Sequence, residues 1–146
     1  MNNTVGHVEI RNSKIHDNGD LKTDSRAGLA TGYAEIQNSI NIINCLVYNN
    51  GKASTAANKS MNGIIAASGT NILNCTVWDN AGEHSGIYAI ESGNPVITTT
   101  NTIAQDYYGK LSSDESVTSS RHLITYSLIP TVREGLTFSE NANNLI

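Results

Sequence analysis

An oxygen-rich stretch near the N-terminus is the first candidate for chemistry. In "HDNGDLKTD" at residues 16–24, three aspartates, Asp17, Asp20 and Asp24, stand in one segment with an Asn-Gly pair. Carboxylate and amide oxygens gathered in a loop are the ligands that Ca²⁺ prefers. The spacing is not that of an EF-hand loop, and an Asn-Gly turn between two strands accounts for the same letters. We therefore expect no cofactor and no metal site, with Ca²⁺ at these aspartates as the alternative.

A second candidate is a group of side chains that could bind sugar rings. Strand alternation places Trp78 and Tyr88 on an outer surface, and Asp79 and amide side chains stand beside them. Aromatic faces with neighbouring polar groups are typical of carbohydrate sites. Single exposed aromatic residues are also ordinary on protein surfaces, so the alternative is that these rings only cover the fold.

The overall composition excludes some classes of partner. The chain has 146 residues, only nine Lys and Arg, and a net charge of −4, so it lacks the clustered basic face that nucleic-acid phosphates require. No apolar run approaches the length of a membrane span, about 20 residues. The first residues, "MNNTVGHVEI", lack the basic start and apolar stretch of a signal peptide. For an extracellular protein, we expect the targeting segment to lie outside this sequence.

An internal repeat must position these residues. The phrases "VEIRNSKIHDNG" at 8–19, "INIINCLVYNNG" at 40–51 and "TNILNCTVWDNAG" at 70–82 share two aliphatic positions around an Asn and a small residue. Two weaker copies follow, so that the spacings are 32, 30, 26 and 26 residues, although "TTTNT" allows a register one residue away in the fourth copy. The aligned positions are Ile10, Ile42, Ile72, Thr98 and Ile124; Asn12, Asn44, Asn74, Thr100 and Tyr126; Ser13, Cys45, Cys75, Asn101 and Ser127; and Ile15, Val47, Val77, Ile103 and Ile129.

The parity of each phrase predicts a corner inside it. Val8 and Ile10 alternate on one side of a strand, whereas Ser13 and Ile15 alternate with the opposite parity. One left-handed residue at Asn12 directs all four side chains to one interior, and Asn tolerates that conformation better than any residue except Gly. We therefore expect a strand, an Asn corner and a second strand in each copy.

A third, glycine-led strand recurs between the copies. It reads "GYAEI" at 32–36, "GIIAA" at 63–67 and "GIYAI" at 86–90. The intervening segments lack the 3.6-residue period of helical repeats. The sequence therefore predicts an all-β fold of about five short coils, in which parallel strands stack rung upon rung.

Stacking places equivalent residues about 4.8 Å apart and so predicts ladders of like side chains. Two cysteines at one ladder position, Cys45 and Cys75, would stack inside the coil. A disulfide has awkward geometry there, so we expect buried free thiols, and two cysteines without a third ligand make no zinc site. The other predicted ladders are aliphatic, at Ile10, Ile42 and Ile72, and amide, at Asn12, Asn44 and Asn74.

These phrases resemble the repeats of the right-handed parallel β-helix, the pectate-lyase-like superfamily. More narrowly, "NCTVWDNAGEHSGIYAIESGNPVITTTNTIAQD" followed by "ITYSLI" is similar to the C-terminal repeats of large secreted or surface proteins of Bacteroidetes-like bacteria. The resemblance implies a right-handed, single-stranded solenoid that is secreted or on the cell surface. It implies no particular activity, because such coils serve lyases, hydrolases, adhesins and passive stalks alike.

We expect a single β-helix domain or fragment over residues 1–146, with repeat coils at about 8–130. The coil at 94–129 departs from the pattern, because the Ser-rich segment "KLSSDESVTSSR" at 110–121 stands where the glycine-led strand should be. The repeat is lost in residues 131–146, which either cap the open end or are the cut edge of a longer protein. Both ends of a coil expose strand edges that something must cover.

The resemblance also indicates which residues catalysis would need. Lyases of this superfamily hold calcium with clustered carboxylates and use Lys or Arg as the base, while its hydrolases use several Asp on adjacent coils and a His. Here Asp17 and Asp79 occupy equivalent positions, but Asn49 separates them, and the four histidines share no ladder position. We therefore assign no catalytic residue.

The sequence-based hypothesis is a non-enzymatic β-helix segment of a secreted or cell-surface bacterial protein. It would serve as a stalk or adhesin whose partner is carbohydrate, such as a host or cell-surface glycan. One alternative is the non-catalytic portion of a polysaccharide lyase or glycoside hydrolase. Another is a self-assembly module whose copies associate end to end.

Overall fold

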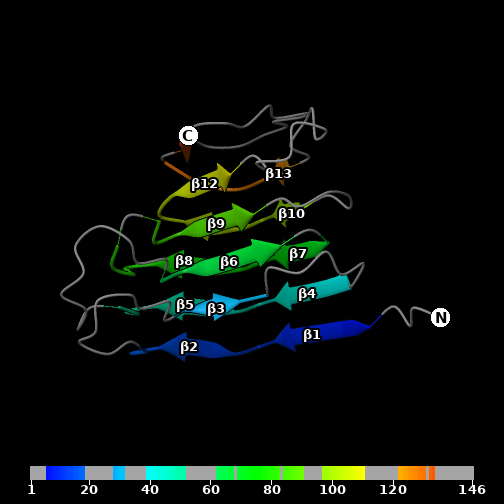
Figure 1. Cartoon of the computed structure of the whole chain (residues 1–146), viewed down its shortest axis with the longest axis horizontal. Helices are drawn as coiled ribbons and strands as arrows, with labels where there is room; N and C mark the ends of the chain where they lie inside the picture. Colours follow the sequence, from blue (N-terminus) through cyan, green and yellow to red (C-terminus); the bar gives the residue numbers. More distant parts are fainter. Residues whose placement is uncertain are drawn as a thin grey trace.

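The chain forms a stack of short coils in the computed structural model. The structure describes residues 6–18, 28–31, 39–51, 62–67, 69–82, 84–90, 97–110, 122–130 and 132–133. Every regular element assigned in these residues is a β-strand, and the strands lie above one another as successive rungs (Figure 1). None of the described residues belongs to a helix that could cross a lipid bilayer.

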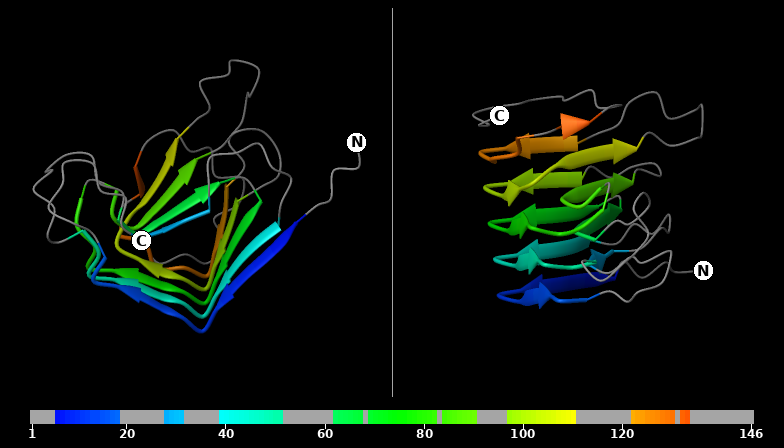
Figure 2. Two further views of the ribbon diagram at one scale, coloured as in Figure 1. Left: turned by 60° about the horizontal axis from the view of Figure 1, so that its bottom comes forward. Right: turned by 90° about the vertical axis from the view of Figure 1, so that its left-hand side faces the viewer.

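Three parallel sheets run along the stack, and each takes one strand from successive coils (Figure 2). Sheet A contains β1 (His7–Arg11), β4 (Ser39–Ile43), β7 (Thr70–Leu73), β10 (Ile97–Thr100) and β13 (His122–Thr125). Sheet B contains β2 (Lys14–His16), β5 (Leu46–Tyr48), β8 (Thr76–Trp78) and β11 (Ile103–Ala104). Sheet C contains β3 (Leu29–Ala30), β6 (Ile64–Ala67), β9 (Ile87–Ile90), β12 (Tyr107–Lys110) and β14 (Val132–Arg133). The predicted all-β parallel β-helix of about five coils is confirmed.

The repeat alignment holds for the first three copies and the fifth. In sheet A, Ile10 pairs with Ile42, and Ile42 pairs with Ile72. In sheet B, Ile15 pairs with Val47. The corner between these sheets therefore falls at the same place in successive coils, which is what an in-register stack of strands requires.

The fourth copy takes the other register that "TTTNT" allows, so its predicted placement is wrong by one residue. Thr99, not Thr98, pairs with Ile72. Asn101 rather than Thr100 turns the corner, with a left-handed φ of 48°. Asn tolerates this backbone, whereas a β-branched Thr does not. The inward positions after it are Thr102 and Ala104 instead of Asn101 and Ile103.

Left-handed residues make two corners in a coil. The first corner, between sheets A and B, has φ values of 48–53° at Asn12, Asn44, Asn74, Asn101 and Tyr126. The second corner, at the end of the sheet B strand, has φ values of 55–57° at Asp17, Asn49 and Asp79. The Asn and Asp side chains suit this conformation. The corners, rather than the strands, give the coil its three-sided outline.

The third strand starts beside a glycine that another coil's backbone closely approaches. A Cβ added to Gly28 would lie 1.9 Å from the carbonyl oxygen of Gly63, and one added to Gly63 would lie 1.8 Å from that of Gly86. Only glycine permits such an approach. The first of these strands is therefore β3, in "GLA" at 28–30, and the prediction of "GYAEI" at 32–36 falls outside the described residues.

The fourth coil keeps its third strand, contrary to the sequence-based expectation. β12 pairs with β9 through Tyr107 and Ile87 and ends at Lys110, so it precedes the Ser-rich segment instead of being replaced by it. Asp106 stands where glycine precedes the other third strands, and its carboxylate accepts a hydrogen bond from the Gly86 amide at 2.6 Å. The Asp106 side chain thus provides the Gly86 N–H with a hydrogen-bond acceptor at the start of the third strand.

The interior is a column of aliphatic and small side chains. Full burial of an Ile or Val side chain contributes about 1.5–3 kcal/mol, and the second coil supplies three such residues, Ile42, Val47 and Ile64. The column is less complete in the N-terminal coil, where Ile10, Ile15 and Leu29 are only partly buried. Its buried members are Ile42, Cys45, Val47, Ile64, Ala66, Ile72, Cys75, Val77, Ile87, Ala89, Ile97, Ala104, Tyr107, Ile124 and Ile129.

Candidate functional site

The outward surface of sheet B, which we call the sheet B face, carries most of the side chains suited to binding. Strand alternation sends Val47 and Val77 into the core and their neighbours to the outside. Two columns of outward residues result. The column beside the first corner is Lys14, Leu46, Thr76, Ile103 and Leu128, and the column beside the second corner is His16, Tyr48 and Trp78.

The second column is aromatic. The rings of His16 and Tyr48 stack with centroids 4.8 Å apart and planes inclined by 16°. Trp78 pairs with Tyr48 on the next strand, and 45% of its surface is exposed. Toward the rest of the described chain, the Trp78 indole makes no hydrogen bond or ring contact. Its face is therefore open to stack on the apolar face of a sugar ring.

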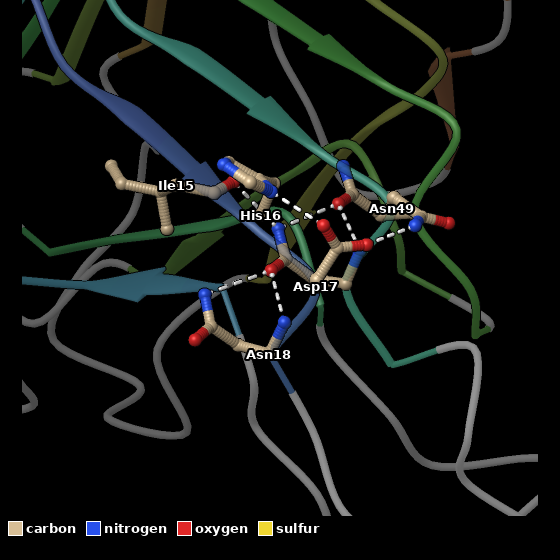
Figure 3. Close-up of polar contacts among 7 residues, drawn as sticks. Ile15, His16, Asp17, Asn18 and Asn49 are labelled. Atoms are coloured by element: carbon tan, nitrogen blue, oxygen red, sulfur yellow. Dashed lines mark hydrogen bonds and ion pairs between the residues drawn. The ribbon is translucent and has the colours of Figure 1, made fainter.

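A strip of carboxylate and amide groups borders the aromatic column at the second corner, and Figure 3 shows its members Asp17 and Asn49 beside His16. Asp17, Asn49 and Asp79 occupy the same left-handed position in successive coils. The Asn49 amide donates to one oxygen of Asp17, and His16 Nδ1 lies 2.5 Å from the other. The hydrogen bond with His16, and then that from Asn49, hold the pKa of the Asp17 carboxyl below its ordinary value. Asp17 is thus an oriented carboxylate beside the stacked rings.

A buried amide ladder, which the sequence analysis missed, fixes the second corner from inside. Fully buried Asn50 donates through Nδ2 to Asn80 Oδ1 at 2.9 Å and to the Ile15 carbonyl at 3.1 Å. The signal was present in the sequence, because an Asn follows the corner residue in "DNG", "NNG" and "DNAG". The ladder consists of Asn18, which is exposed, and the buried Asn50 and Asn80, with Gln105 bonded to Asn80 in the fourth coil.

The predicted amide ladder lies on the opposite border of the sheet B face, at the first corner. Asn44 Nδ2 donates to Asn12 Oδ1 at 3.3 Å, and Asn101 Nδ2 donates to Asn74 Oδ1 at 2.7 Å. All four residues are exposed, so their remaining amide groups face solvent. The face is therefore bordered by hydrogen-bonding groups on both sides.

A shallow groove of about 340 Å³ opens along the first corner in the upper coils. Ile103, Tyr126 and Leu128 line it, and they are 42%, 62% and 41% exposed. Thr76, which pairs with Ile103, separates this apolar group from Trp78 along the strand. The sheet B face therefore carries two separate exposed apolar groups, Trp78 in the aromatic column and the residues that line this groove.

Tyr88 does not belong to this face, and the prediction that it is exposed is wrong. It lies on sheet C, and only 6% of its surface is exposed. Its ring stacks with those of His84 and Tyr108, at centroid distances of 5.1 and 5.3 Å. Parity alone predicts the outward direction of Tyr88, but it does not reveal that His84 from the preceding turn packs over that side. Of the predicted sugar-binding residues, the structure brings Trp78 and Asp79 together.

The cysteines are buried free thiols at equivalent rungs. Cys45 Sγ and Cys75 Sγ donate to the Ile43 and Leu73 carbonyls, each at 3.3 Å. Burial raises the pKa of the Cys75 thiol to about 11, so it is protonated near neutral pH. A protonated, buried thiol is a poor nucleophile and a poor metal ligand, and it acts here as a small core side chain.

The calcium prediction is only partly within the described residues. Asp17 is described, whereas Asp20 and Asp24 lie outside the described ranges. Among the residues that the structure does describe, no group of three His, Cys, Asp or Glu side chains is placed to hold a metal ion. No family model matches the chain, and no curated protein or solved structure matches it either.

Proposed function

We propose that this chain is a non-enzymatic, right-handed β-helix segment of a secreted or cell-surface bacterial protein, and that its sheet B face binds carbohydrate. The observation that carries the proposal is the exposed indole of Trp78 beside the stacked rings of Tyr48 and His16. The apolar face of a sugar ring stacks on such side chains, while its hydroxyls bond to nearby amides and carboxylates.

The repetition of the fold supports an extended glycan as the ligand. Each of the first three coils presents one outward ring, from His16, Tyr48 or Trp78, and one border residue, and successive coils lie about 4.8 Å apart along the stack. Successive sugar units of one chain would therefore meet similar groups on successive coils. An open face of this type fits a polysaccharide that lies along the solenoid better than a single enclosed sugar.

The charges beside the aromatic column support a neutral glycan over an acidic one. Two acidic residues, Asp17 and Asp79, border the column. The positively charged residue on this face is Lys14, which lies in the other outward column. The depressed pKa of Asp17 keeps that carboxyl ionised at neutral pH. Uronate carboxylates would meet like charge at this border, which disfavours their binding.

The test is binding of the full chain to immobilised neutral and uronic-acid polysaccharides, with Trp78→Ala as the main variant. Loss of the indole should weaken binding of neutral polysaccharide by about tenfold or more, because the stacking surface is removed. Trp78→Phe should keep part of the affinity. Val8→Ala is the matched control, since Val8 is equally exposed, at 49%, but lies on sheet A.

Two results would contradict the proposal. One is an absence of binding to every polysaccharide tested, and the other is a Trp78→Ala variant that binds as the wild type does. Incubation with uronate polymers, with and without Ca²⁺, tests the alternative of a lyase or hydrolase portion. Release of shortened chains by the purified protein would replace the non-enzymatic proposal.

A further inference from the structure

Tyr126 occupies a corner whose backbone does not suit it. The other described first corners use Asn, whereas Tyr126 adopts the same left-handed backbone with φ of 50°. A bulky side chain is strained there, and an Asn would both relieve the strain and find a ladder partner in Asn101. Strained backbone conformations cluster at binding sites, where the side chain held in this way has a role. The choice of Tyr at this corner is therefore not explained by stability.

The Tyr126 ring is part of an apolar platform that lines the groove at the first corner. Most of the ring is exposed, and its hydroxyl makes no hydrogen bond within the described part of the chain. Ile103 and Leu128 supply the apolar surface beside it. Ile103 is exposed although Thr76 and Leu128 flank it on the two adjoining coils, so this surface opens sideways from the stack.

Amide groups border the platform along the same corner. Asn101 Nδ2 donates to Asn74 Oδ1, which orients both side chains. Toward the other described residues, the Asn74 Nδ2 and the Asn101 Oδ1 make no hydrogen bond, so one can donate to a ligand hydroxyl and the other can accept from one. None of the described residues that line the groove is Asp, Glu, Lys, Arg or His. An uncharged ligand with apolar ring faces and hydroxyl groups fits this lining.

We propose that the groove around Tyr126 is a second subsite for the neutral polysaccharide that the aromatic column binds, an inference that rests on the proposed function of the sheet B face. Tyr126 lies two coils from Trp78, which is about 10 Å along the stack. It also lies at the opposite border of a three-residue strand, which is about 10 Å across. The two rings are thus roughly 14 Å apart, too far to share one sugar unit.

One glycan chain therefore has to run along the solenoid and cross the face obliquely to stack on both rings. Once the chain is held at Trp78, its binding at Tyr126 is intramolecular. The second contact then adds affinity only for chains long enough to span the two rings. Chain length is consequently the variable that separates the two subsites.

Calorimetric titration of the full chain with size-graded oligosaccharides of neutral glucans and mannans tests the proposal. We expect affinity to rise at the length that reaches both rings. Tyr126→Asn should remove this rise, a loss of about tenfold for long oligosaccharides, and should leave short ones unaffected. Because Asn suits this corner, unfolding does not account for the loss. Tyr126→Phe should bind nearly as the wild type does, and Val8→Ala, on sheet A, is the control.

The single tryptophan of the chain provides a second readout. In the wild type, the fluorescence of Trp78 reports on the aromatic column. In a Trp78→Phe, Tyr126→Trp variant, the fluorescence reports on the groove instead. Long oligosaccharides should protect the tryptophan from quenching by acrylamide in both proteins, since one bound chain covers both positions.

The outcomes separate this inference from the proposed function. If Tyr126→Asn binds long oligosaccharides as the wild type does while Trp78→Ala loses binding, the second subsite is refuted and the proposed function stands. If no neutral oligosaccharide binds, both fail. If sedimentation velocity shows self-association that Tyr126→Asn abolishes, the groove belongs to a second copy of the chain, and the subsite is again refuted.

Discussion

One residue per coil must adopt a left-handed backbone at the first corner, and the residue types found there differ in how well they tolerate it. Four corners use Asn, which also bonds to the equivalent Asn of a neighbouring coil. The fifth uses Tyr126, with φ of 50° and 62% of its surface exposed. A bulky residue is strained in this conformation, by about 1–2 kcal/mol.

Replacement of Asn44 should show what the corner asparagine contributes. We expect Asn44→Ala to lower the free energy of unfolding by about 1–3 kcal/mol, through backbone strain and the lost bond to Asn12. Asn44→Gly should cost less, because glycine adopts the same φ freely. Chemical denaturation measures both. Equal stability of the two variants would show that left-handed backbone tolerance is not the role of this residue.

The same reasoning predicts a stabilising change at the fifth corner. Tyr126→Asn should raise the free energy of unfolding by about 1 kcal/mol, because it relieves the strain and extends the amide ladder to Asn101. A rise in thermal midpoint is the readout. Tyr126→Phe keeps the strained backbone and should leave the midpoint unchanged, so a similar rise in both variants would point to surface effects instead.

The buried ladder at the second corner predicts a pH-dependent variant. In Asn50→Asp, an ionised carboxylate cannot donate to the Ile15 carbonyl or to Asn80, so burial among acceptors raises its pKa in the folded state. The folded form then binds more protons than the unfolded form, and stability falls as pH rises above the ordinary Asp pKa, about 3.9. Denaturation at several pH values, relative to Asn50→Ala, measures this. Parallel pH profiles of the two variants would contradict it.

At the scale of elements, the strands are too short to hold their own position, so the residues between them set it. β3 and β11 span only two residues each. The strands of sheet A follow segments of variable length, and those of sheet B follow the first corner. The first four strands of sheet C follow Gly28, Gly63, Gly86 and Asp106. The glycine positions allow the closest approach of neighbouring backbones.

Gly63→Ala tests this packing. The new Cβ would lie 1.8 Å from the Gly86 carbonyl oxygen, and because that atom is backbone, the strand itself must shift. We expect a loss of about 3 kcal/mol or more, seen as a lower denaturation midpoint. Gly6→Ala, at an exposed residue before β1, is the control and should be nearly neutral. A Gly63→Ala variant as stable as this control would refute the close approach.

Much of this element order could be predicted because the corner phrase is periodic. Ile10, Ile42 and Ile72 share one register, and the Asn corner explains the change of parity after it. The fourth copy was ambiguous since consecutive threonines give two equally good alignments. Gly28 was missed because "GLA" is short and Gly32 competes with it nearby in the sequence.

The candidate site was less predictable for a tertiary reason. Trp78 could be identified from one strand, but the column it forms with Tyr48 and His16 exists only when strands are read across coils. The burial of Tyr88 depends on His84, a residue from a turn whose direction no strand pattern specifies. Contacts within a rung were thus visible in the sequence, and contacts made by turns were not.

At the scale of the whole molecule, the described strands of each coil pair only with strands of the coils next to it. Corner-to-corner spacings are 32, 30, 27 and 25 residues, yet the same register is kept throughout. The differences in length fall outside the strand–corner–strand phrase. Stability in such a stack is approximately a sum over coils and their interfaces.

Removal of one complete coil should therefore be tolerated. Deletion of residues 44–73 joins Ile43 to Asn74 and keeps both corners, so we expect a folded, less stable protein with a β-type circular dichroism spectrum. Deletion of residues 44–74 also removes the corner Asn and slips the register by one residue, which should prevent folding. Similar behaviour of the two deletions would contradict a register fixed at the corner.

The left-handed backbone that recurs at the first corner of every coil also bears on how such a chain lengthens in evolution. Tandem duplication of a gene segment from one corner to the next would add one coil. This coil would pack in register, because the coils next to it already carry matching side chains. Recombination between repeats could then change the reach of the protein in steps of about 4.8 Å. Any ligand contacts on the outer columns would multiply with each step.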